Sequence, residues 1–290
     1  MRKYFSFFKL GLIGSVKLIL AYFKIKFLGY TLNIEQNAII HHYNFILAFN
    51  LEHKKWGRND AVVSSEKFGD LAIRKFPTSD MNVFKQVCID NEYGHLITLV
   101  HNKLTEGRIT MIDGGANIGL TSIALFVSLS PKYQLESVLV EPFSENLRQI
   151  KKNIELQKIT GFTLLKAGIT NKPGFLELDY SYRDSLEWSI QIKESLIPTE
   201  IKSIEICEIL DQKKWEIVDI LKLDIEGAEG LLFQDRNYAK FFLRRVCLLA
   251  IEIHEEYISK ELVLEILKEE GFHMTPHGEL HIGYNCNLLS

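Results

Sequence analysis

From residue 109 to the end of the chain, short apolar runs alternate with segments whose apolar residues recur every three or four positions. The short runs predict buried strands, and the three-to-four-residue period predicts amphipathic helices. The predicted strands span residues 109–113, 136–141, 162–167, 218–224 and 246–254, and the predicted helices lie near 118–129, 143–157, 226–242 and 258–270. This alternation predicts an α/β fold with a mostly parallel, doubly wound sheet.

Two further segments, 174–178 and 204–209, alternate polar and apolar residues. A period of two predicts half-exposed strands. Between them, residues 180–203 carry no pattern that predicts an element. We interpret the region between the two strands as an insertion that faces the substrate.

The chain before residue 106 is patterned differently. Residues 31–77 show no sustained helical period and are interpreted as an irregular or β-containing segment with a turn at 57–60. Thr78, Ser79 and Asp80 supply capping residues for a helix predicted over 81–103, which Gly94 interrupts. We therefore divide the chain into residues 1–30, residues 31–105 as an N-terminal extension and cap, and residues 106–290 as the domain of the parallel sheet.

Residues 4–30 are strongly apolar and aromatic, but Lys9, Lys17, Lys24 and Lys26 interrupt them. A membrane-spanning helix needs about 20 mainly apolar residues, and a central lysine costs about 2.5–3.5 kcal/mol. Lys17 therefore disfavours a span. We expect a helix lying at a membrane surface, on a cytoplasmic protein that touches the inner membrane face. The alternative is a helix packed on the catalytic part of the chain or on a partner chain.

Composition narrows the function classes. With 290 residues, 47% of them hydrophobic, the chain can bury a substantial core. Its formal net charge of -3 argues against a general nucleic-acid binder, which usually carries a strong basic excess. The cysteines are far apart with no C-x-x-C pair, so we expect neither a structural zinc site nor a disulfide framework. The sequence leaves the oligomeric state open.

Residues 109–121 carry the strongest chemical signal, because an apolar strand ends on Asp113 and runs directly into a glycine-rich turn and a helix. Such turns bind nucleotide cofactors. The dinucleotide pattern G-x-G-x-x-G requires glycine where the chain has Ala116, and Asp113 would repel a pyrophosphate. A carboxylate here suits a ligand with an ammonium group and no phosphate, which favours S-adenosylmethionine over NAD. The alternative is that Asp113 only caps the following helix.

The next apolar run ends on Glu141, which Pro142 follows. In open parallel sheets the ligand lies at the carboxyl ends of the strands, where Glu141 can accept hydrogen bonds from both ribose hydroxyls. The predicted cofactor-binding residues are Asp113, Gly114, Gly115, Ala116, Asn117, Gly119, Thr121, Glu141, Pro142, Ala167 and Asp224.

A third strand ends in a group of acids, Asp224, Glu226 and Glu229, with Gly227 allowing a tight turn. Repulsion between close carboxylates raises the pKa of at least one of them unless a cation intervenes, and Lys222 or a bound sulfonium is the expected cation. The alternative is that Glu226 and Glu229 only decorate the first turn of a helix, where acids meet the helix dipole favourably.

His254 ends the strand run 248–254 at the same edge of the predicted sheet. Because an imidazole titrates near neutral pH, His254 is a candidate general base, with Asp224 as the competing base. Glu226 completes the predicted catalytic group, and a purely structural histidine is the alternative for His254. Although Glu252 adds another metal-ligating group, these residues lack a characteristic ligand spacing, and no metal is predicted.

Taken together, these segments resemble the FkbM-type S-adenosylmethionine-dependent methyltransferases. The resemblance rests on residues 112–121, 140–142 with Asn146 and Asn153, 221–229 and 251–254, and it extends over roughly residues 70–285.

The resemblance implies a class I methyltransferase fold. It places Asp113, Gly115 and Asn117 at the methionine end of the donor and Glu141 on its ribose. The chain departs from the family at Gly114, where members more often have a bulkier residue.

The resemblance also implies O-methylation, often of sugar or polyketide hydroxyls. Our leading hypothesis is an O-methyltransferase with a small-molecule or glycan acceptor. A non-catalytic donor-binding module that assembles with glycan-building enzymes is the second hypothesis. Asp113 and Ala116 disfavour the third, an NAD-dependent oxidoreductase.

Overall fold

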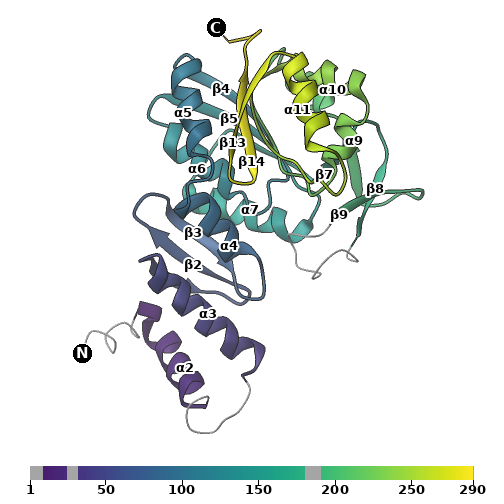
Figure 1. The fold of residues 1–290 in the computed structure, drawn as a ribbon. Helices are drawn as coiled ribbons and strands as arrows, with labels where there is room; N and C mark the ends of the chain where they lie inside the picture. The colour runs from purple at the N-terminus through teal and green to yellow at the C-terminus, as the bar shows by residue number, and fades with distance from the viewer. Residues whose placement is uncertain (1–8, 25–31, 180–190, 290) are drawn as a thin grey trace.

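The computed structural model describes residues 9–24, 32–179 and 191–289. Its centre is a seven-stranded sheet with the order β6-β5-β4-β11-β12-β14-β13 and helices on both faces (Figure 1). The strands are β4 (Gly107–Gly114), β5 (Tyr133–Val140), β6 (Phe162–Leu165), β11 (Val218–Leu223), β12 (Val246–Glu252), β13 (Phe272–His277) and β14 (Leu280–Asn285). The helices between them are α6 (Leu120–Leu129), α7 (Ser144–Gln157), α8 (Ile206–Lys213), α9 (Glu229–Phe233), α10 (Arg236–Leu243) and α11 (Lys260–Glu269).

The sheet is parallel except at β14, which pairs antiparallel with both β12 and β13. Numbered by their order in this sheet, the strands run 3-2-1-4-5-7-6, which is the order of the class I methyltransferase fold. The doubly wound, mostly parallel sheet predicted from the sequence is therefore confirmed. The closing β13–β14 hairpin was not predicted.

The central strands are rich in Val, Ile and Leu because they are covered on both faces. Met111 of β4 points into one hydrophobic core and Ile112 into the other. Strands buried on both sides read as continuous apolar runs, as expected for a parallel sheet. The register pairs Lys222 with Asp113 and Leu223 with Gly114, so β4 and β11 end together. This shared carboxyl edge is where polar side chains gather.

A second sheet, with the order β7-β10-β8-β9, lies beside the first. Its strands are β7 (Ala167–Ile169), β8 (Phe175–Asp179), β9 (Gln191–Ser195) and β10 (Ile201–Ile204). The strand predicted over 162–167 is in fact two strands, because β6 ends at Leu165 and β7 joins the second sheet. The strand predicted over 174–178 is confirmed by β8. Residues 180–190 of the predicted insertion lie outside the described residues.

The strand predicted over 204–209 is wrong. β10 ends at Ile204, and helix α8 begins at Ile206. Ile206, Ile209 and Leu210 are buried at the three-and-four spacing of a helix. Six residues were too few to distinguish this spacing from a period of two, especially because Cys207 is buried as well.

Before residue 75, the described residues form the helices α2 (Gly11–Phe23) and α3 (Ile34–Ala48) and an antiparallel sheet of β1 (Glu52–Trp56), β2 (Asp60–Ser65) and β3 (Gly69–Arg74). The predicted β content and the turn at 57–60 are confirmed. Helix α3 was missed because apolar residues lie nearly all round it and leave no period. A capping box was the available signal, since Asn33 and Gln36 exchange side-chain-to-backbone hydrogen bonds of 2.9 and 3.2 Å.

The helix predicted over 81–103 is three shorter segments, α4 (Asp80–Phe84), the π-helical η3 (Lys85–Ile89) and α5 (Gly94–Lys103). Gly94 begins the last segment after the break. Ser79 is the N-cap residue of α4, as predicted, but its side chain makes no capping hydrogen bond. The Asp80 carboxylate instead accepts hydrogen bonds from the backbone N–H and the guanidinium of Arg74, each at 2.7 Å.

Helix α7 joins the N-terminal sheet to the central domain. β3 is an edge strand, and edge strands present unpaired backbone groups. Gln149 donates to the Ala72 carbonyl at 2.5 Å, and Asn153 accepts from the Ala72 N–H at 2.7 Å. Gln157 donates to the carbonyls of Asp70 in β3 and of Phe68 just before it, at 2.6 and 2.7 Å. One polar face of α7 thus satisfies the free edge and fixes the N-terminal part against the sheet that carries the site.

Within the described ranges 9–24, 32–179 and 191–289, no helix has both the length and the apolar character that crossing a membrane requires. In Figure 1, α2 lies at the end of the molecule that is remote from the β13–β14 hairpin.

Candidate active site

Two cavities lie along the carboxyl edge of the central sheet. The first, which we call the donor cavity, is lined by Gly115, Asn117, Val140, Glu141, Pro142, Phe143, Asn146, Ala167, Gly168, Ile169, Asp224, Ile225 and Glu226. The second, the acceptor cavity, has a volume of about 680 Å³ and lies between this edge and residues 83–93 and 252–256. Gly115, Asn117, Asp224 and Glu226 line both cavities. These four residues form the junction.

The glycine-rich turn after β4 passes so close to β11 that one position accepts only glycine. Gly115 has φ +71°, and a Cβ there would lie 1.8 Å from the Asp224 carbonyl oxygen. Asn117 also has a positive φ, of 50°. Its side-chain oxygen is buried without a hydrogen-bond partner in the described structure. The junction therefore combines a closely packed backbone with an unpaired acceptor.

Asp113 does not contact either cavity, which corrects its predicted role as a donor ligand. Its carboxylate is fully buried, accepts a hydrogen bond of 2.6 Å from Ser122 and lies 3.4 Å from the Lys222 ammonium. It does not cap the helix either, because Gly119 is the N-terminal cap of α6. Gly114 and Gly119 likewise lie behind the cavity walls.

Lys222 is the cation expected among the carboxylates. It is 2% exposed and lies 3.4 Å from both Asp113 and Asp224. Burial lowers the pKa of Lys222, but the two carboxylates outweigh burial and raise it overall. The ammonium also donates to the carbonyls of Gly114 and Gly115, at 3.1 and 2.6 Å. Asp113 thus acts through Lys222, which holds the glycine turn against β11.

Glu141 faces the donor cavity at the end of β5. Its two carboxylate oxygens accept hydrogen bonds from the backbone N–H groups of Asn117 and Phe143, at 2.8 and 2.9 Å. Burial raises the pKa of Glu141 to about 7, against the lowering effect of these N–H groups. The Asn146 side chain also hydrogen-bonds this carboxylate, and the remaining lone pair can accept a hydrogen bond from a ligand hydroxyl. Pro142 and Ala167, which the sequence placed among the cofactor-binding residues, line the same cavity.

The acceptor cavity is strongly acidic. The acids on its wall are Glu92, Asp224, Glu226, Glu252, Glu255, Glu256 and Glu279, and the basic side chains are Lys222 and His254. Ala116 and Thr121 also line this cavity rather than the donor cavity. Burial, followed by repulsion from Asp224, raises the pKa of Glu252. The sequence pointed to the acids after β11, but it missed Glu92 and Glu279, which come from distant segments.

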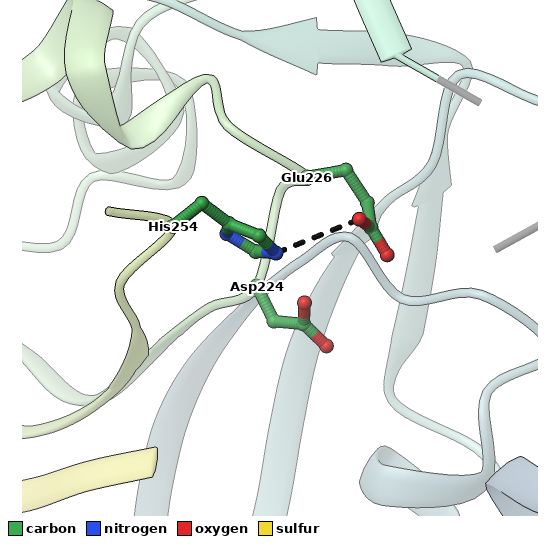
Figure 2. A group of neighbouring side chains, drawn as sticks. All are labelled: Asp224, Glu226 and His254. Carbon is green, nitrogen blue, oxygen red and sulfur yellow. Dashed lines mark ion pairs between the residues drawn. The ribbon is translucent and has the colours of Figure 1, made fainter. Parts of the chain in front are cut away.

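His254 follows β12 and lies beside Asp224 and Glu226 (Figure 2). Its Nε2 is 3.5 Å from Glu226 Oε2 and 3.7 Å from Glu252 Oε1, and its Nδ1 is 3.2 Å from Glu229 Oε2. Burial lowers the pKa of His254, but the surrounding carboxylates outweigh it and raise the pKa to about 11. These carboxylates therefore favour the protonated ring over the neutral one. The prediction of His254 as a general base does not fit this environment.

The sequence named Glu229 in the group of acids after β11 but gave it no catalytic or cofactor-binding role, and in the structure it begins α9 (Glu229–Phe233). It is fully buried, and its carboxylate accepts hydrogen bonds of 2.9 Å from the backbone N–H groups of Ile225 and Gly227. This carboxylate closes the turn after β11 and orients the His254 ring. The interpretation of Glu229 as a mere helix-terminal acid is therefore insufficient. The signal in the sequence was an acid two residues after a glycine, directly beyond a strand end.

The sequence matches the model of the methyltransferase FkbM domain over residues 113–274, which is more than half of the chain. No curated protein matches the chain. The matched residues begin at the carboxyl end of β4 with Asp113 and include Glu141 and the acids after β11.

Several solved structures are similar in fold at low identity. Methyltransferase FkbM from Methylobacillus flagellatus KT is 18% identical, with a TM-score of 0.41 over 62% of this chain and 43% of that one. The precorrin-6y C5,15-methyltransferase from Geobacter metallireducens GS-15 is 12% identical, with a TM-score of 0.35 over 66% and 83%. A SAM-dependent methyltransferase from Aquifex aeolicus is 15% identical, with a TM-score of 0.36 over 69% and 90%.

The chain thus spans less than half the length of the Methylobacillus protein. The family assignment rests on the sequence match, and the strand order of the central sheet agrees with it. The family match also supports S-adenosylmethionine, which the sequence predicted, as the methyl donor. The chain belongs to the FkbM methyltransferase family.

Proposed function

We propose that this protein transfers a methyl group from S-adenosylmethionine to a hydroxyl group of a sugar, a glycan or a related secondary metabolite. The observation that carries the proposal is the junction, where Gly115, Asn117, Asp224 and Glu226 line both cavities. Methyl transfer requires the donor and acceptor atoms to meet in line, so two adjoining cavities with a shared wall suit the reaction.

The residues of the donor cavity fit S-adenosylmethionine. Glu141 presents a buried carboxylate with a free lone pair, suited to a ribose hydroxyl. The unpartnered oxygen of Asn117 at the junction suits the ammonium of the methionine end. When bound, the donor supplies an electrophilic methyl group on a sulfonium. The chain's own task is to fix that group at the junction and to exclude water.

The acceptor cavity suits a molecule rich in hydroxyl groups, because its wall carries many carboxyl oxygens, which accept hydrogen bonds from hydroxyls. At the junction, Asp224 is our proposed proton acceptor for the reacting hydroxyl, with Glu226 next to it. General-base assistance of this kind contributes about 10² to 10⁴-fold. His254 donates to Glu226 and Glu229 instead, and so positions the acids rather than taking the proton.

A first experiment tests the donor without an acceptor. Calorimetry with S-adenosylhomocysteine should give one binding event per chain in the wild type and weakened binding in Glu141→Ala. Asp113→Ala should lower stability as well as binding, because Asp113 contacts Lys222 rather than the cavity. Absence of binding to the wild type would refute the donor assignment.

A second experiment tests turnover. Purified protein with S-adenosylmethionine and a panel of glycans and polyhydroxylated metabolites should release S-adenosylhomocysteine, and Asp224→Asn should lower kcat while donor affinity persists. The runner-up function is a non-catalytic donor-binding module that assembles with glycan-building enzymes. Donor binding without turnover on the panel, together with co-purification of such enzymes, would favour the module.

We further propose that α2 contacts a membrane surface. Leu12, Val16, Ile19, Leu20 and Phe23 recur at helical spacing and are exposed, whereas Leu18 and Ala21 are buried. An exposed apolar helix face beside lysines suits an anionic lipid surface. Sedimentation with phosphatidylglycerol vesicles should retain the wild type and release the double variant Ile19→Asp, Leu20→Asp. Ile217→Asp, an exposed apolar position in another part of the chain, is the matched control. Equal retention of all three proteins would refute the contact.

A further inference from the structure

Two acids of the junction, Asp224 and Glu226, lie close to His254 of the acceptor cavity. Asp224 follows β11, Glu226 lies two residues later, and His254 follows β12. Each offers one ligand atom, and these atoms all lie within 4.8 Å of one another. Figure 2 shows the His254 ring turned toward Glu226, with the Asp224 carboxylate beside them.

The spacing is close to that of an occupied site. Carboxylate oxygens and imidazole nitrogens bind divalent metals at about 2.0–2.2 Å, so ligands on opposite sides of an ion are about 4.2 Å apart. The ligand atoms here lie within 4.8 Å of one another, which is only slightly wider than that spacing. The Asp224 and Glu226 side chains are 29% and 39% exposed, so their carboxylates can rotate into place without disturbing the core.

The imidazole is held in the orientation that a metal ligand requires. Its Nδ1 contacts the Glu229 carboxylate at 3.2 Å, and backbone N–H groups fix that carboxylate in turn. Metal-ligating histidines almost always donate their other ring N–H to such a partner. With Nδ1 engaged, Nε2 is the atom that faces Glu226, at 3.5 Å.

Charge in the acceptor cavity also favours a cation. Seven carboxylates line the cavity wall, against the side chains of Lys222 and His254. Lys222 is already shared between Asp113 and Asp224 behind the junction. A divalent ion between Asp224 and Glu226 would relieve the repulsion that close carboxylates exert on one another.

We propose that Asp224, Glu226 and His254 Nε2 bind one divalent metal ion at the junction of the two cavities. Mixed carboxylate and imidazole ligation suits an ion such as Mn²⁺. Binding replaces the Nε2 proton of His254, which leaves to solvent. Three protein ligands leave coordination positions open, and water or acceptor hydroxyls would complete them from the cavity. The last point rests on the proposed acceptor, whereas the ion site itself does not.

The test uses Mn²⁺ alone and the full chain, after dialysis against a chelator. Electron paramagnetic resonance measures free Mn²⁺, and saturable binding of one ion per chain is expected. Asp224→Asn and His254→Gln should each weaken Mn²⁺ binding by at least about tenfold, since even outer partners of metal ligands contribute that much. Glu279→Gln removes a cavity carboxylate outside the ligand set and should change the affinity less than about twofold.

Two outcomes would overturn the proposal. One is weak, unsaturable binding, and the other is an equal loss in Glu279→Gln and in the ligand variants, which indicates diffuse attraction to an acidic surface. Because a variant can fail by unfolding, electron spin echo measurements on wild-type protein give a test without substitution. Nitrogen coupling from His254 should appear on the bound Mn²⁺, and its absence would exclude imidazole ligation.

Calorimetry with S-adenosylhomocysteine separates this proposal from the proposed function. Donor binding that persists without Mn²⁺ binding would remove the ion and leave the methyltransferase assignment intact. Mn²⁺ binding without donor binding would leave the ion site intact and remove the proposed donor chemistry.

Discussion

The donor and acceptor cavities share a wall, but their polar groups come from different sources. The donor cavity is lined by short segments at the ends of β4, β5 and β11 and by β7, and backbone N–H groups there bind the Glu141 carboxylate and fix the turn after β4. The acceptor cavity is built by side chains from segments far apart in sequence, from Glu92 to Glu279. The difference teaches that donor recognition depends on backbone shape, whereas acceptor recognition depends on the balance of charge.

Lys222 connects the two regions, so its removal should have the largest effect. Lys222→Met would leave the buried Asp113 carboxylate without its cation and release the carbonyls of Gly114 and Gly115. Removing one partner of a buried ion pair costs about 3–5 kcal/mol. We expect urea denaturation to show a loss of that size in the free energy of unfolding.

The double variant Lys222→Met, Asp113→Asn is the control for that experiment. It removes the uncompensated charge and should recover part of the loss. A single variant as stable as wild type would show that Lys222 does not hold the two regions together.

The second-largest effect is expected from a change of backbone shape at Gly115. Gly115→Ala combines a positive φ with a Cβ placed 1.8 Å from the Asp224 carbonyl oxygen. Left-handed backbone strain and forced repacking together should cost about 2–4 kcal/mol of folding free energy, measured by urea denaturation, and weaken S-adenosylhomocysteine binding in calorimetry.

Gly278→Ala is the matched control, because Gly278 has φ +62° but nothing within 4 Å of a Cβ. It should cost only about 1 kcal/mol, the strain of the backbone alone. Equal effects at the two positions would mean that the close approach to β11 is unimportant.

The third-largest effect is expected from removal of the Glu141 carboxylate. Glu141→Ala should weaken S-adenosylhomocysteine binding by about 1.5–3 kcal/mol, as expected when hydrogen bonds to a charged group are lost. Calorimetry measures the change, and Glu279→Ala in the acceptor cavity is the control that should leave donor affinity unaltered. Unchanged affinity in Glu141→Ala would remove this residue from the donor site.

The smallest expected effect is a pH dependence of donor binding. The pKa of Glu141 is raised to about 7, so the carboxylate is ionised above that pH and protonated below it. Because the ionised form accepts hydrogen bonds from hydroxyls, donor affinity should be level above pH 7. It should fall as pH decreases below 7, by up to about tenfold per unit. Glu141→Gln should lack this component, and an identical profile in both proteins would contradict it.

Much of the central domain could be predicted from the sequence because its signals are local. Apolar runs such as 218–223 identify strands without knowledge of their neighbours, and the glycine-rich turn after Asp113 identifies the cofactor edge. Where the local signal was weak, the prediction failed. Helix α3 has no amphipathic period, and the short segment 204–209 fits a strand pattern although the chain forms α8.

The features of the candidate site also fall into those that the local sequence predicts and those that depend on distant residues. The sequence by itself determined which strand ends carry acids, at Asp113, Glu141 and Asp224, since strand length and turn residues are written consecutively in the chain. Only the tertiary structure decided that Asp113 faces Lys222 rather than the donor. It also decided that His254 lies beside Glu226 and Glu229, because these contacts join residues more than 20 positions apart in the chain. Charge state is a property of the assembled neighbourhood, and no local pattern encodes it.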